Sequence, residues 1–144
     1  MVDIGLTHIA LPVSQLERSI EFYQTYAAMQ VVHQRIDAES GVAVAWLTDH
    51  TRPFAIVLIQ TGSVHPVLSP LAHLGVGCQS RDEVDRLCYK AREAGVLVQE
   101  PQDSGYPVGY WAFLRDPDGH TLELSYGQEI GLAVEETGTH LIQN

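Results

Sequence analysis

The order of apolar and polar residues predicts a strand followed by a helix at the start of the chain. Residues 6–12, LTHIALP, alternate with a period of two, which is typical of a strand with one buried face. In the next segment, SQLERSIEFYQTYAAM, apolar residues recur at helical spacing. Ser14 and Glu17 have the S-x-x-E spacing of a capping box, so the helix is predicted to begin there. The predicted buried face of the helix consists of Leu16, Ile20, Tyr23 and Ala27.

Three strand-like segments follow, and the same order of elements then occurs a second time. The segments QVVHQRI, GVAVAWLTD and FAIVLIQTG complete a βαβββ unit. The second half begins with LAHLGVGCQ and the helical SRDEVDRLCYKAREAG, where Ser80 and Glu83 repeat the capping box and Gly95 ends the helix. The strand-like VLVQ, GYWAFLR and HTLELSY follow. The pattern predicts an α+β fold made of two tandem βαβββ modules.

The second half matches the first at the constant shift of 65 residues that separates His8 from His73, which indicates an internal duplication. We therefore predict a single domain. Its parts are a first module (5–62), a linker (63–70), a second module (71–127) and a C-terminal tail (128–144), which is expected to pack on a partner subunit. The pairs that coincide at this shift are His8 with His73, Trp46 with Trp111, Leu58 with Glu123 and Gly62 with Gly127.

Composition narrows the classes of partner. The 144 residues are 45% hydrophobic, which is enough to bury one core, and the formal net charge is -10. With 8 Lys+Arg against 18 Asp+Glu, the chain would repel nucleic acid and an anionic membrane surface. No stretch is apolar for long enough to span a membrane, and the N-terminus does not resemble a secretory signal, so a cytoplasmic location is expected. Cys78 and Cys88 are interpreted as buried free thiols.

Strand alternation places one polar residue on the face opposite the aliphatic residues in each of three strands. These polar residues are His8, His73 and Glu123. If the aliphatic faces pack on the helices, all three side chains point to the other, concave side of the sheet. Glycines 75 and 77 beside His73 would leave room there. The aliphatic sets are Ile9, Leu11 and Val13; Leu74, Val76 and Cys78; and Leu122, Leu124 and Tyr126.

Two imidazoles and one carboxylate form the ligand set of a facial triad. Such a set suits a divalent first-row metal and leaves positions open for water or substrate. Taken singly, a strand histidine is more often structural, and Glu123 could be a solvated residue on a half-exposed sheet. Three residues related by alternation and by the duplication favour a metal site formed by His8, His73 and Glu123.

Three segments carry motifs of a known superfamily. THIALPVSQLERSIEFYQTYAAMQVV, AHLGVGCQSRDEVDRLCYKAREAGV and FLRDPDGHTLELSYG resemble the vicinal oxygen chelate superfamily. That superfamily includes glyoxalase I, extradiol ring-cleaving dioxygenases, fosfomycin-resistance transferases, methylmalonyl-CoA epimerase and bleomycin-binding proteins. The resemblance covers residues 5–127, and its motifs are specific for the superfamily rather than for one member.

The resemblance implies a fold, a metal and an assembly. Eight strands of the two modules would form a cup-shaped, incompletely closed mixed sheet around the metal, with the helices on its outer face. His8, His73 and Glu123 fall on the metal-ligand positions, and the divalent ion would be Fe, Mn, Ni or Zn. The implied assembly is a homodimer that pairs modules across subunits, so that His8 can serve a site whose other ligands belong to the partner chain.

The sequence departs from this superfamily's best-known members at two positions. Glyoxalase I and the epimerase take a fourth ligand, Glu or Gln, from the strand that here reads FAIVLIQTG, where the duplication places Leu58. A leucine cannot coordinate a cation, so Leu58 is expected to line the substrate pocket, and Gln60 would need a register slip to replace it. The dioxygenases and fosfomycin transferases tend to have Tyr where this chain has Phe113, and the loop EPQDSGYPVGYW lacks the basic residues of the fosfomycin pocket.

Aromatic residues are predicted to wall the pocket. Alternation places Trp111 and Phe113 on one face of GYWAFLR, and the duplication places Trp46 opposite Trp111. Such walls suit a flat or apolar ligand, although core packing is an equal alternative for Trp46. Tyr106 and Tyr110 flank the loop before this strand and are candidates for a catalytic phenolic acid beside Glu123.

These observations favour a metal-dependent enzyme that acts on a small molecule. The first hypothesis is dioxygenase-type chemistry on a phenolic or catecholic substrate, because it fits three ligands and aromatic walls. A glyoxalase-like lyase or isomerase, or a thiol transferase of the fosfomycin-resistance type, is the second hypothesis. The third is a non-catalytic protein that sequesters a drug or ligand, like the bleomycin binders.

Overall fold

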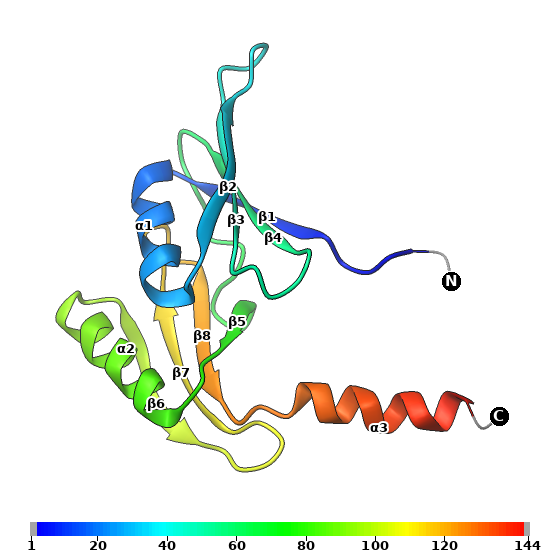
Figure 1. Cartoon of the computed structure of the whole chain (residues 1–144). Helices are drawn as coiled ribbons and strands as arrows, with labels where there is room; N and C mark the ends of the chain where they lie inside the picture. Colours follow the sequence, from blue (N-terminus) through cyan, green and yellow to red (C-terminus); the bar gives the residue numbers. More distant parts are fainter. Residues whose placement is uncertain (1–2, 143–144) are drawn as a thin grey trace. The chain divides into compact units, whose positions relative to one another are not determined.

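The computed structural model describes residues 3–142, apart from the side chains of residues 132–133 and 139–142. The chain forms two compact units, each with a four-stranded sheet (Figure 1). Unit 1 comprises Met1–His73 and Arg115–Thr121, and unit 2 comprises Leu74–Leu114 and Leu122–Asn144. The predicted α+β fold of two βαβββ modules is confirmed. The elements are β1 (His8–Val13), α1 (Leu16–Ala27), β2 (Gln30–Ile36), β3 (Ala43–Thr48), β4 (Ala55–Gln60), β5 (His73–Gly77), α2 (Arg81–Glu93), β6 (Leu97–Asp103), β7 (Tyr110–Arg115), β8 (Thr121–Tyr126) and α3 (Ile130–Ile142).

The sheet of unit 1 has the strand order β1-β4-β3-β2. β1 and β4 are parallel, and the other neighbours are antiparallel. Helix α1 packs against β3 and β4 (Figure 1), and the strand residues on that side are aliphatic because a helix beside a sheet buries apolar surface from both. The buried strand residues on this face are Leu11, Val13, Ala45, Leu47, Ile56 and Leu58, and the predicted α1 face of Leu16, Ile20, Tyr23 and Ala27 is buried with them.

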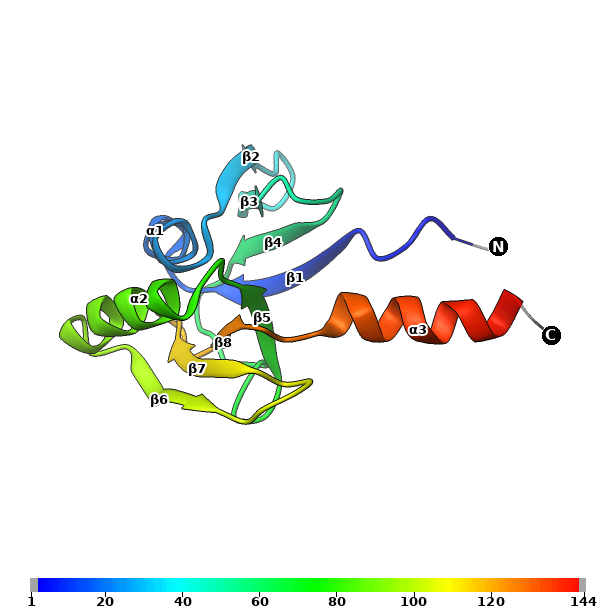
Figure 2. The same ribbon diagram turned by 60° about the horizontal axis from the view of Figure 1, so that its bottom comes forward.

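The sheet of unit 2 has the strand order β5-β8-β7-β6, and α2 packs against β6 (Figure 2). β6 and β7 are antiparallel, with two register irregularities along β6. The predicted apolar face of α2 is buried, and so are the alternate aliphatic residues of β7 and β8. These residues are Val84, Leu87, Cys88 and Ala91 on the helix, and Ala112, Leu114, Leu122 and Leu124 on the strands.

The segment after β8 forms the helix α3. Ile130 and Val134, one helical turn apart, are both largely exposed on it. That this segment packs on a partner subunit stays a prediction. Among the residues that the structure describes, no helix is both long and apolar enough to cross a bilayer.

The two capping boxes predicted from the sequence have different outcomes. At α2 the N-cap half of the prediction is confirmed, because the Ser80 hydroxyl accepts a hydrogen bond from the Glu83 backbone N–H at 3.1 Å, while the Glu83 carboxylate accepts hydrogen bonds from Arg86. At α1 it is wrong: the N-cap is Gln15, whose side chain makes no capping bond. The Glu17 carboxylate instead accepts a hydrogen bond from the Gln34 side chain. The N–H groups at the start of α1 are satisfied by residues distant in sequence, which a local motif cannot reveal.

The turn between β7 and β8, DPDGH, is packed within unit 1 although both flanking strands belong mainly to unit 2. Asp116 is only 3% exposed. Its Oδ1 accepts hydrogen bonds from the backbone N–H groups of Asp118 and His120, both at 2.9 Å, and its Oδ2 accepts one from the Tyr23 hydroxyl at 2.8 Å. A buried carboxylate is tolerated because three donors replace its lost hydration.

Two further side chains of this turn bind the start of the chain. The Asp118 carboxylate accepts a hydrogen bond from the Ser14 N–H, just before α1. The His120 ring is fully buried, and its Nε2 lies 2.9 Å from the Pro12 carbonyl oxygen while its Nδ1 accepts from the Leu68 N–H at 3.4 Å. Because a carbonyl only accepts, Nε2 carries the proton. His120 is therefore a satisfied structural residue rather than only a turn residue.

Asp116 and Tyr23 shift each other's ionisation. Burial raises the pKa of Asp116, while the hydrogen bond from Tyr23 acts in the opposite direction. Burial, followed by the charge and hydrogen bond of Asp116, raises the pKa of Tyr23 well above its usual range. An acid whose pKa is higher in the folded state stabilises the fold fully below its unfolded pKa. That contribution is lost as the pH rises through the folded pKa.

The Tyr23→Phe substitution is expected to lower the free energy of unfolding by about 1–3 kcal/mol at pH 7, because Asp116 Oδ2 loses its donor. Without that donor the folded-state pKa of Asp116 rises further, so the loss should shrink as the pH falls from about 7 toward about 4. Urea unfolding of both proteins across this pH range measures it.

Tyr26→Phe is the matched control, because Tyr26 is also a buried tyrosine of α1 but its hydroxyl has no hydrogen bond within the described residues. Its cost should stay below about 0.5 kcal/mol. An equal loss in both variants, or a Tyr23→Phe loss that does not depend on pH, would contradict the role assigned to Asp116.

Candidate functional site

His73 and Glu123 lie on adjacent strands of one sheet, β5 and β8. The Cys78 N–H donates to the Ser125 carbonyl at 2.6 Å, and the Ser125 hydroxyl donates to the Val76 carbonyl at 3.4 Å. These two bonds flank Gly77, so Gly77 lies opposite Ser125 in a parallel pairing, the pairing that β1 and β4 also use. Two residues earlier, Gly75 lies opposite Glu123, and alternation places His73 on the same face as Gly75.

Glycines clear the space on this face. A Cβ added to Gly75 or Gly77 would meet no atom within 4 Å. Glu123 itself is 7% exposed, and its Oε1 accepts a hydrogen bond from the Gln128 side chain at 3.2 Å. The His73 side chain is exposed, and its Nδ1 donates to the Leu71 carbonyl at 2.7 Å. Its Nε2 therefore carries the lone pair, as in a histidine that binds a metal.

The hairpin of β7 and β8 places an aromatic pair on the Glu123 face. The Asp116 N–H donates to the His120 carbonyl, and at the other end of the hairpin Gly109 lies against the backbone of Gly127. Both observations give the same antiparallel register, in which Phe113 lies opposite Glu123. Trp111 is on this face too, because its ring centroid lies 4.8 Å from that of Phe113 and its Nε1–H donates to the Ser104 hydroxyl.

His8 lies in unit 1 on the face of its sheet that α1 does not cover. Its side chain is exposed, and its Nδ1 lies 2.9 Å from the Thr7 hydroxyl. Cross-strand pairing places Ala10, Val57 and Trp46 in a row on this face. Trp46 is 41% exposed and therefore is not a core residue. His33 stacks on Trp46, with ring centroids 4.8 Å apart.

The prediction that Leu58 lines the pocket is wrong. Leu58 has no exposed surface and pairs with Leu11 on the face that packs on α1. The residue that pairs with Ala10, two positions after His8, is Val57, just as Glu123 lies opposite Gly75, two positions after His73. Val57, rather than Leu58, therefore corresponds to Glu123. The shift between the modules is 65 residues at β1, 67 at β3 and 66 at β4, because the stretch from β5 to β7 is two residues longer than its counterpart and the turn between β7 and β8 is one residue shorter.

The two extra residues before β7 change the partner of Trp46. In unit 1 Trp46 lies opposite Val57. In unit 2 the residue opposite Glu123 is Phe113, so Phe113, and not Trp111, corresponds to Trp46. The sequence placed both of them on the pocket face correctly, but it matched the wrong pair.

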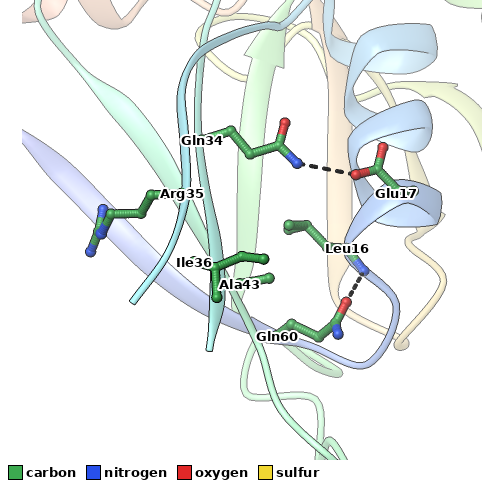
Figure 3. Close-up of a pocket in the computed structure, with 7 residues that line it drawn as sticks. All are labelled: Leu16, Glu17, Gln34, Arg35, Ile36, Ala43 and Gln60. Carbon is green, nitrogen blue, oxygen red and sulfur yellow. Dashed lines mark hydrogen bonds between the residues drawn. The ribbon is translucent and has the colours of Figure 1, made fainter. Parts of the chain in front are cut away.

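Gln60 serves α1 rather than a metal. Its Oε1 accepts a hydrogen bond from the Leu16 N–H at 2.9 Å, which satisfies a free donor at the start of the helix (Figure 3). It borders a cavity of about 410 Å³ on the α1 side of the sheet, opposite the face of His8. This cavity contains none of the predicted ligands. Its lining residues, drawn in Figure 3, are Leu16, Glu17, Gln34, Arg35, Ile36, Ala43 and Gln60.

The prediction that Tyr110 is a catalytic acid is also wrong. Alternation places Tyr110 on the Ala112 side of β7, away from Phe113 and Glu123. Its hydroxyl donates to the Asp85 carboxylate, which raises the pKa of the phenol, and the Arg81 guanidinium lies 4.1 Å from the ring centroid. Tyr106 is 68% exposed in the loop before β7, and its catalytic role stays a prediction.

The donor set of the predicted site fits a divalent metal. Two imidazole nitrogens and one carboxylate oxygen match the preferences of first-row ions. The structure places His73 and Glu123 on one face of one sheet, and His8 on the open face of the other sheet. Within the described residues, no three His, Cys, Asp or Glu side chains lie together as a metal-binding group.

Residues 5–124 match the family model described as the Glyoxalase/Bleomycin resistance protein/Dioxygenase superfamily. An uncharacterized protein of Pseudomonas aeruginosa is 40% identical over 129 residues, which cover 88% of this chain and 91% of that one. A probable lactoylglutathione lyase of Vibrio cholerae is 25% identical over 94% of this chain and 99% of its own. The fold resembles that of the fosfomycin resistance protein FosX of Listeria monocytogenes, solved with Mn(II), with a TM-score of 0.70 and 22% identity over 92% of this chain and 99% of that one.

Gln60→Leu is expected to lower the free energy of unfolding by about 1 kcal/mol, because the Leu16 N–H loses its acceptor. The metal content of the purified protein should not change. Denaturant unfolding and elemental analysis of the same preparation check both points. A loss of metal without a loss of stability would return Gln60 to the ligand set.

Proposed function

Because this chain belongs to the Glyoxalase/Bleomycin resistance protein/Dioxygenase superfamily, we propose that it is a metal-dependent enzyme acting on a small molecule, with His8, His73 and Glu123 as the metal ligands. The observation that carries this proposal is the position of Glu123. It is a nearly buried carboxylate that shares a sheet face with His73, above glycines that leave the space open.

The residues around the proposed ligands support it. The Leu71 carbonyl fixes His73 with its Nε2 as the donor atom, and the Thr7 hydroxyl can hold His8 in the same way. The Gln128 side chain orients the Glu123 carboxylate. When bound, a divalent ion at such a site polarises substrate oxygens and stabilises the negative charge that develops on them.

We further propose dioxygenase-type chemistry on a phenolic or catecholic substrate. Val57 corresponds to Glu123 in the first module and cannot coordinate, so the site has three protein ligands and keeps positions open for two substrate oxygens. The Trp111 and Phe113 rings lie on the face of Glu123, where they would hold a flat ring against the ligands and exclude water.

A lyase or isomerase reaction is the second candidate, favoured by the alignment with the Vibrio cholerae relative along 94% of this chain. The absence of a carboxylate at Val57 argues against it, because that strand supplies no base for proton transfer. The fosfomycin-type transferase rests on fold similarity alone, and a sequestering protein would not need the ligands. A homodimer that exchanges ligands between subunits also belongs to the proposal.

Protein purified without a chelator is expected to contain about one divalent ion per chain, measured by elemental analysis. His8→Ala, His73→Ala and Glu123→Gln should each reduce the metal content by about tenfold or more, because each removes a direct ligand. His65→Ala is the control, since it changes an exposed linker histidine. Wild-type protein without stoichiometric metal, or His73→Ala with unchanged metal, would refute the site.

The same variants test the homodimer. If ligands come from two chains, an equimolar refolded mixture of His8→Ala and Glu123→Gln should recover metal at about a quarter of its sites, because half of the dimers are heterodimers and each of these has one intact site. If the ligands come from one chain, the mixture should recover none.

The protein loaded with iron or manganese is expected to consume oxygen with catechols, followed with an oxygen electrode. Glu123→Gln should abolish the uptake, and His65→Ala should leave it unchanged. If no catechol supports uptake and the protein instead forms lactoylglutathione from methylglyoxal and glutathione, the lyase candidate would replace the dioxygenase.

A further inference from the structure

A second cavity, of about 400 Å³, opens in unit 1 beside the start of β1. Thr7 and Ala55 belong to its lining, and both are tied to His8. Thr7 is hydrogen-bonded to the His8 ring, and Ala55 pairs with His8 across the strands, on the same face of the sheet. The cavity therefore adjoins a proposed metal ligand, yet it contains no part of the proposed metal site.

The lining of this cavity carries one arginine in a strongly acidic chain. Arg52 and His50 line it together with the Thr48 hydroxyl, and no Asp or Glu is among its lining residues. The chain as a whole has a net charge of -10. An arginine beside a cavity raises the local electrostatic potential, which favours a negative group there.

Arg52 is available to a ligand. Four other arginines form salt bridges with carboxylates, including Arg35, which borders the cavity of Figure 3 and pairs with Asp37 at 2.8 Å. Within the part of the chain that the structure describes, the Arg52 guanidinium forms no hydrogen bond or ion pair. The charge of Arg52 acts on the Asp49 carboxyl. Burial raises the pKa of Asp49, but hydrogen bonds from Thr51 and the charge of Arg52 lower it, and the pKa is lowered overall.

His50 is held beside Arg52 in a backbone conformation that disfavours most side chains. Its φ is +61°, in the left-handed region that glycine adopts without cost. The Thr48 hydroxyl accepts its backbone N–H at 3.3 Å, and its Nε2–H donates to the Gln30 side chain at 3.1 Å. An imidazole is thus presented at the cavity where a glycine would fit the backbone better.

The rest of the lining is apolar. Val32 is half exposed and lies with Phe54 and Pro53 beside the two basic residues. A fork of guanidinium donors beside an apolar wall suits a ligand with a flat or aliphatic body and one acidic group. A monoanion fits better than a dianion, because a single arginine must balance the negative charge of the ligand within the negative field of the whole chain.

We propose that this cavity binds the carboxylate of an organic acid through Arg52, with the apolar part of that acid against Val32 and Phe54. The inference rests on the proposed function only where it identifies this acid as the substrate. In that case the substrate carries a carboxylate that lies on Arg52.

The test compares two probes that carry no chelating oxygen pair and so do not depend on the metal. The chain is titrated with benzoate and with benzyl alcohol, followed by calorimetry and by amide NMR shifts. Benzoate should bind about tenfold more tightly and shift the amide signals of Thr48 and His50. Arg52→Gln should remove this preference, while Arg35→Gln, the matched change at a salt-bridged arginine, should keep it.

A third variant tests the imidazole. His50→Gly keeps the backbone conformation and should leave the preference for benzoate unchanged, because His50 already donates its Nε2–H to Gln30 and its Nδ1 cannot donate to a carboxylate. Equal affinity for the two probes, no saturable benzoate binding up to about 10 mM, or the same loss in Arg35→Gln would overturn the proposal. If the preference depends on Arg52 but no metal is bound, the cavity stands and the proposed enzyme function fails.

Discussion

Each module has four strands and only one helix packed against them, and one helix can cover only one face of a sheet. This constraint orders the rest of the structure. In unit 1 the covered face takes the aliphatic residues around Leu11, Leu47 and Leu58, and in unit 2 it takes Leu114, Leu122 and Leu124. Strand alternation then sends the neighbouring residues to the other face. That second face carries the histidines, the carboxylate and the aromatic rings on which the proposed chemistry depends.

The burial of the DPDGH turn is a second constraint, and it is polar. Asp116, Asp118 and His120 reach backbone groups and a tyrosine of unit 1 that lie about a hundred residues earlier in the chain. Buried polar groups are stable only when their partners are in place, so this turn can adopt only a narrow set of arrangements. The strand that follows it carries Glu123. Fixing the turn therefore also fixes the register in which Phe113 lies opposite that carboxylate.

The proposed site and the Arg52 cavity divide recognition into two parts. The ligand face of unit 2 is suited to oxygens and to a flat ring, because it combines one carboxylate, one oriented imidazole and two aromatic walls. The cavity of unit 1 adds positive charge to an otherwise acidic protein and adjoins His8. The Arg52 cavity would hold the carboxylate of an organic acid in a chain whose net charge is -10.

The sequence by itself determined the elements, the duplication and the face of each strand, because periodicity is a local property of the chain. It therefore placed His73, Glu123, Trp46, Trp111 and Phe113 on the faces where the structure has them. Only the tertiary structure decided what depends on neighbours distant in sequence. The second module has one more residue before β8 than the first has before β4, so Val57, and not Leu58, is the counterpart of Glu123. The backbone N–H groups at the start of α1 donate to the side chains of Gln60 and Asp118, and not to that of Ser14. Hydrogen bonds between strands and across the chain set register and capping, and a single sequence carries no direct record of them.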